Sequence, residues 1–173
     1  MSDIRDQVVD DRGVIKKLQL MFPGYHGYRV SEDLRDADIY LKDELYKKML
    51  DIINDLKAAE SSLVSNGIFT NLDKIGQTRS KIQTAAADLK HHQAGYSGIS
   101  AAIKVTPAKI SSLYDLDMKI YEQIQTLSTV IQGFKQECAQ GNFNQARLQD
   151  VNSAVGSISQ LNQSRETLLY GGV

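Results

Sequence analysis

The fold is decided by residues 31–67, SEDLRDADIYLKDELYKKMLDIINDLKAAESSLVSNG. Ser31 is a hydroxyl cap, and the two carboxylates after it stand where the helix dipole favours negative charge. One face then recurs every three or four positions, which is helical spacing: Leu34, Asp38, Leu41, Leu45, Met49, Ile52, Leu56, Ala59 and Leu63. Asn66-Gly67 is a typical helix exit. The stretch predicts one helix of about 36 residues, roughly 54 Å long.

Four further stretches show the same spacing. Residues 3–22 predict a first helix with charges on its outer face. Residues 72–92 predict a third, and Thr106 followed by Pro107 is a strong start signal for a fourth that reaches Cys138. A last helix is expected from about Asn144 to Leu168.

Five helices joined by short connections should alternate in direction. We therefore expect an all-α chain, a single domain over residues 1–173, built as an elongated up-and-down bundle of four to five long antiparallel helices. No strand pattern competes, and the expected helix content is about 75% or more, against a usual value near one-third.

Two glycine–tyrosine segments separate the helices. The first is Phe22-Pro23-Gly24-Tyr25-His26-Gly27-Tyr28, and the second is Gly95-Tyr96-Ser97-Gly98. Proline and glycine force the chain to turn, and one helix up and one helix down lie between the two segments. We expect both at the same end of the bundle.

Charged residues stand on the helical stripes where an apolar side chain is expected, namely Asp38, Asp117 and Arg165, with Arg79 as a weaker case. In an alternating bundle the first three fall within three turns of one end, so Arg165 is expected to be buried and bonded to Asp117, Asp38 or both, helped by Arg35. Such a cluster can fix helix register. It can also form a polar pocket, roofed by Tyr25, Tyr28 and Tyr96 with His26 as donor.

Composition excludes several classes of function. Lys and Arg total 20 against 21 Asp and Glu, a net charge of −1, so no global field attracts nucleic acid or anionic lipid. No stretch has the 18 or more apolar residues of a spanning helix, and the first residues are acidic, so we expect a soluble, cytoplasmic protein. His91 and His92 point in different directions on a helix, and we expect no metal and no cofactor. Cys138, the single cysteine, is expected to be a buried, inert thiol.

The FPGYHGY loop, the SEDLRDAD helix start at residues 31–38, the GYSG segment, Leu113-Tyr114-Asp115-Leu116-Asp117 and the late Arg165 together resemble a group of uncharacterised prokaryotic helical proteins. The resemblance spans most of the chain. It implies a helical bundle with a shared Phe-Pro-Gly-Tyr-x-Gly-Tyr loop, and it implies no activity.

Three classes of function remain. The first is a non-catalytic interaction or scaffold module that binds a protein partner or a second copy. The second is a small-ligand or anion-binding protein whose pocket reaches Asp38, Asp117 and Arg165. The third, and least favoured, is an enzyme with Asp38 or Asp117 as base and His26 as acid, because no nucleophile, metal or cofactor motif accompanies them.

Overall fold

The chain forms a bundle of long helices, seen in a computed structural model that describes residues 13, 16–24, 31–91 and 106–170. The helices are α2 (Ser31–Ser65), α3 (Leu72–His91), α4 (Pro107–Ala139) and α5 (Gln145–Tyr170). The structure is 88% helical, and no strand occurs among the described residues, which confirms the all-α prediction. Of the expected first helix, residues 13 and 16–22 are described; residues 13 and 16–21 are helical, and Phe22 follows the helix end.

Local sequence signals set the helix ends. The Thr106 hydroxyl accepts a hydrogen bond from the Lys109 amide at 3.3 Å, and Pro107 is the first helical residue of α4. Gly67 and Gly141 follow the ends of α2 and α4 with φ of +75° and +73°, a conformation that costs other residues more. The Asn144 side chain accepts from the Arg147 amide at 3.1 Å and caps α5.

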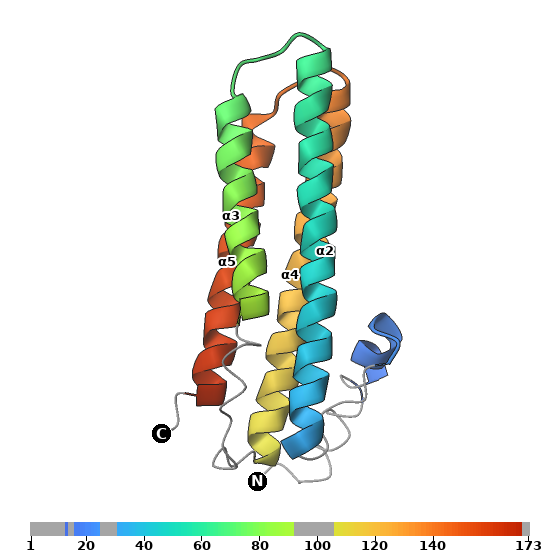
Figure 1. The fold of residues 1–173 in the computed structure, drawn as a ribbon, viewed down its shortest axis with the longest axis vertical. Helices are drawn as coiled ribbons and strands as arrows, with labels where there is room; N and C mark the ends of the chain where they lie inside the picture. Colours follow the sequence, from blue (N-terminus) through green and yellow to red (C-terminus); the bar gives the residue numbers. More distant parts are fainter. Residues whose placement is uncertain (1–12, 14–15, 25–30, 92–105, 171–173) are drawn as a thin grey trace.

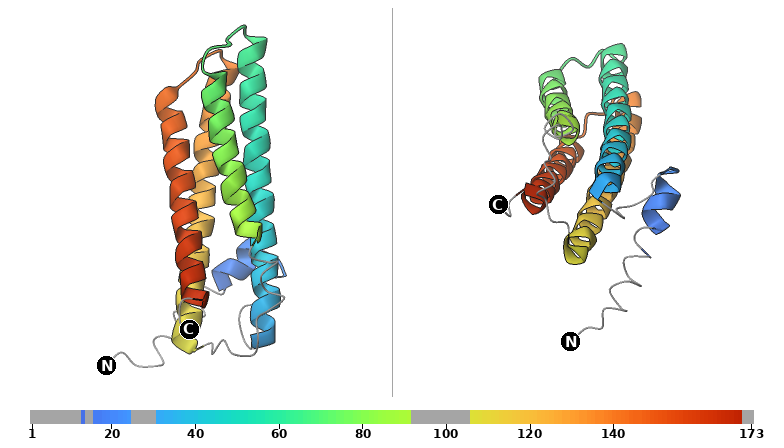
Figure 2. Two further views of the ribbon diagram at one scale, coloured as in Figure 1. Left: turned by 60° about the vertical axis from the view of Figure 1, so that its left-hand side comes forward. Right: turned by 60° about the horizontal axis from the view of Figure 1, so that its bottom comes forward.

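Consecutive helices run in opposite directions, but not every neighbouring pair is antiparallel (Figure 1). Helix α2 packs against α3 and α4, and α5 packs against α4 and α3. The neighbours α2 and α4 therefore run in the same direction, as do α3 and α5, while α3 and α4 lie on a diagonal. Figure 2 shows this square arrangement from two further sides. The molecule is two antiparallel hairpins laid side by side.

The core consists of one apolar stripe from each helix. Residues of the segment 16–24, which precedes α2, add to this core. Leu18 and Phe22 are 0% and 1% exposed. The Phe22 ring meets the edge of the Tyr121 ring at 5.2 Å between centroids, and the Lys48 ammonium lies over both rings. Tyr40 on α2 donates to the carbonyl of Pro23. These contacts hold residues 16–24 against α2 and α4.

The two hairpins are tied together at the end where both turn. The Asn66 side-chain amide donates to the Ser62 carbonyl at 2.9 Å and lies 3.5 and 3.4 Å from the carbonyl oxygens of Cys138 and Ala139. Those two carbonyls belong to the last turn of α4, where helix carbonyls have no partner within the helix. Asn66 thus caps α4 from the neighbouring hairpin.

We predict that Asn66→Ala lowers the free energy of unfolding by about 1 kcal/mol, the usual net value of a lost hydrogen bond. Urea denaturation followed by circular dichroism measures the change. The control is Asn54→Ala, an exposed position on α2, which should change stability by less than about 0.5 kcal/mol. Equal effects of the two substitutions on stability would contradict a role of Asn66 in linking the two hairpins.

Candidate functional site

A buried ion pair joins α4 to α5. The Arg165 Nε donates to the Asp117 Oδ1 at 2.5 Å, and the two side chains are 2% and 1% exposed. This is the contact that the stripe pattern predicts. Both residues also take part in further interactions. A charge buried alone is costly, so the pair can be buried only because the signs complement each other and the geometry permits a charge-assisted bond.

The pair lies at or just beyond the end of α3. Contacts between the parallel helices α3 and α5 set their register: Lys74 donates to Gln145 at 3.0 Å, and Asn152 donates to Thr78 at 3.2 Å. Continuing these two contacts brings Arg165 level with the last residue of α3 or up to three residues past it. Figure 1 shows α3 ending before the other three helices at this end of the bundle. The polar pair therefore lies where α3 no longer supplies an apolar stripe.

Two further polar side chains are buried in the same region, and sequence reasoning missed both. Asn162 is 4% exposed and lies one turn from Arg165 on the core face of α5, while Lys42 on α2 is 2% exposed. The contacts Lys48–Tyr121 and Gln132–Asp55 set the register of α2 on α4 and bring Lys42 to about the height of Asp117. Helical spacing in the sequence could have located both residues on the buried faces, because Lys42 follows Asp38 by four residues and Asn162 follows Ile158 by four.

The other predicted members of the cluster are only partly described. Asp38 and Arg35 lie in α2, but their side chains are outside the described part, as are all of Tyr25, His26, Tyr28 and Tyr96. The prediction that the two glycine–tyrosine segments share one end also falls on residues outside it.

The weaker candidate, Arg79, does not join the cluster. It pairs with Glu60 of α2, and both side chains are about one quarter exposed, at 28% and 26%. Arg79 therefore bridges the α2–α3 hairpin near the surface.

The described groups do not form a reactive centre. Asp117 is held by a guanidinium and enclosed. Burial, helped by the nearby Glu137 carboxylate, raises the pKa of the Cys138 thiol to about 11, so this side chain is a neutral thiol near pH 7. No group of three metal-ligating side chains occurs among the side chains that the structure describes, which from α2 onward are those of residues 39–90, 106 and 108–169. The arrangement is suited to holding helices in place.

None of the described helices combines the length and apolar character that crossing a membrane requires. No family model matches the chain, and neither does any curated protein or solved structure.

We predict that Arg165→Ala lowers the free energy of unfolding by about 3–5 kcal/mol, because it leaves a carboxylate buried without its cation. Chemical denaturation measures the loss.

The matched control is Arg79→Ala, which breaks the half-buried pair with Glu60. This substitution should cost less than about 1 kcal/mol. Similar losses of unfolding free energy for the two substitutions would show that burial does not make the Arg165 pair more important for stability than the Arg79 pair.

Proposed function

We propose that this protein is a non-catalytic helical interaction module that acts in the cytoplasm by binding another protein. The observation that carries the proposal is an exposed aromatic side chain at the tip of the α2–α3 hairpin. Phe69 is 67% exposed, although its neighbour Ile68 packs against the core. Aromatic side chains are enriched at protein–protein interfaces, which supports Phe69 as a contact residue.

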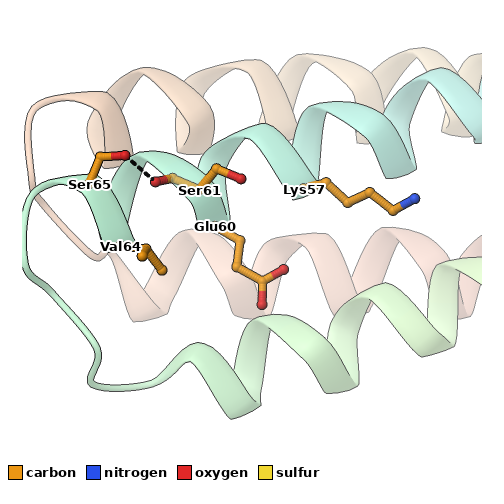
Figure 3. A pocket seen from close by; sticks show the side chains of 5 residues that line it. All are labelled: Lys57, Glu60, Ser61, Val64 and Ser65. Atoms are coloured by element: carbon orange, nitrogen blue, oxygen red, sulfur yellow. Dashed lines mark hydrogen bonds between the residues drawn. The ribbon is translucent and has the colours of Figure 1, made fainter.

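An open groove lies beside this tip. It has a volume of about 540 Å³ and is lined by residues of the last turns of α2, Lys57, Glu60, Ser61, Val64 and Ser65. Figure 3 shows Val64 and Glu60 pointing from α2 toward the side on which α3 lies. Val64 is 42% exposed. The tip therefore offers two exposed apolar side chains, Phe69 and Val64, beside a shallow open depression.

The polar cluster supports this function less directly. Its enclosed Asp117–Arg165 pair favours a role in helix register over acid–base chemistry. The runner-up is a small-ligand or anion-binding site at that end, favoured by one observation: the buried side-chain oxygen of Asn162 accepts no hydrogen bond within the described part of the chain. We also propose that this chain belongs to the prokaryotic group with the Phe-Pro-Gly-Tyr-x-Gly-Tyr loop. That membership would assign no activity to it.

We predict that a photo-crosslinking amino acid at position 69 captures one discrete protein in the producing cells. The crosslinking group reacts only at short range, so a side chain in van der Waals contact with a partner becomes joined to that partner. Gel electrophoresis and mass spectrometry identify the product.

The control places the same amino acid at Lys119, an exposed position on α4, which should give no discrete product. Val64→Ser should weaken the crosslink from position 69, because it removes an apolar neighbour of the groove. Identical product patterns from positions 69 and 119 would contradict the proposed function.

A further inference from the structure

Leu50, Lys57 and Val64 form one line along the outside of α2. They are seven residues apart, and seven residues are two helical turns with a drift of only about 20°. Leu50 is 39% exposed and Val64 is 42% exposed, and Lys57 is exposed between them. We refer to these three residues as the α2 stripe. It is distinct from the core face of α2, which includes Leu45, Ile52, Leu56 and Leu63.

The α2 stripe places a cation between two apolar side chains. Lys57 forms no ion pair with any described residue, and it lines the groove that Val64 also lines. The neighbouring acidic side chain in the groove, Glu60, is already paired with Arg79. The charge that the stripe presents to a partner is therefore positive, and a complementary surface carries a carboxylate at the centre.

We propose that the α2 stripe binds an amphipathic helix of another protein, with a carboxylate opposite Lys57 and apolar side chains over Leu50 and Val64. The stripe is about 21 Å long on the helical rise, so the bound helix has at least four turns. Leu50 and Val64 are fourteen residues apart on the same face of α2, so a partner helix that lies along α2 can contact both with side chains of one face. This inference rests on the proposed function and specifies its partner.

A second copy of the chain is not complementary to this surface. An antiparallel pairing that places Leu50 against Val64 of the copy has its centre at position 57, so it brings the two Lys57 ammonium groups together. A parallel pairing in register does the same. Like charges face to face are unfavourable, and Lys57 therefore selects against self-association through this face.

The test uses two synthetic helical peptides of about 18 residues. One carries Leu, Glu and Leu at seven-residue spacing on one face, and the other carries Leu, Lys and Leu at the same positions. NMR titration of the folded, isotope-labelled protein detects weak binding and reports its location. We expect the Glu peptide to shift amide signals of residues 50–64 and to bind about fivefold more tightly than the Lys peptide, as a partly exposed charge pair predicts.

Charge reversal makes the test specific. Lys57→Glu should invert the preference between the peptides, Val64→Ser should weaken both, and Lys119→Glu on α4 should change neither. All three positions are exposed, and the amide spectrum of each variant verifies its fold. Unchanged preference in Lys57→Glu, or shifts confined to other helices, would overturn the proposal.

Two outcomes separate this inference from the function that it specifies. One outcome is a discrete crosslink from position 69 together with peptide binding that does not change in Lys57→Glu. It would refute the inference about the α2 stripe but would still support an interaction module. A wild-type dimer that Val64→Glu dissociates in sedimentation experiments would show that a second copy occupies the stripe, which also refutes it.

Discussion

The enclosed ion pair between Asp117 and Arg165 is the constraint on which the arrangement of the bundle depends. Two charges removed from water are stable only while they face each other. Any slide or rotation of α5 against α4 would separate them, whereas apolar side chains tolerate such shifts with little loss. Two outer contacts act in the same direction: Arg147 with Glu137 near one end of the hairpin, and the Lys109 ammonium with the Leu169 carbonyl near the other.

The position of the pair follows from the unequal lengths of the helices. Helix α3 has 20 residues, whereas α2, α4 and α5 have 35, 33 and 26. Where all four helices run together, the core is apolar apart from the buried Thr78. Near the end of α3, four polar side chains are buried among apolar ones such as Leu41 and Leu113: Lys42, Asp117, Asn162 and Arg165. A buried ion pair adds little net stability compared with an apolar replacement, so we infer that its role here is to select one helix alignment.

Much of this fold could be predicted from sequence, because the signals are local. The Thr106 cap and the Gly67 exit located helix ends, and the charged stripe positions located Asp117 and Arg165. The pairing of helices could not be predicted, because α3 can follow α2 and still lie diagonal to α4. Lys42 was missed since lysine is usually solvated. Asn162 was missed since asparagine is mostly exposed in folded proteins, whereas here it lies on the buried line with Ile158 and Arg165.

An inner polar contact thus holds the helices together, and the outer flank of α2 is the surface that we propose for a protein partner. A double-mutant cycle on the inner contact tests this most directly, with Asp117→Leu, Arg165→Met and the double variant compared by urea denaturation. We predict that each single variant is strongly destabilised and that the double variant recovers, giving a coupling free energy of at least about 2 kcal/mol. Losses that add to within about 0.5 kcal/mol would show that the two residues act independently and would contradict the central role of the pair.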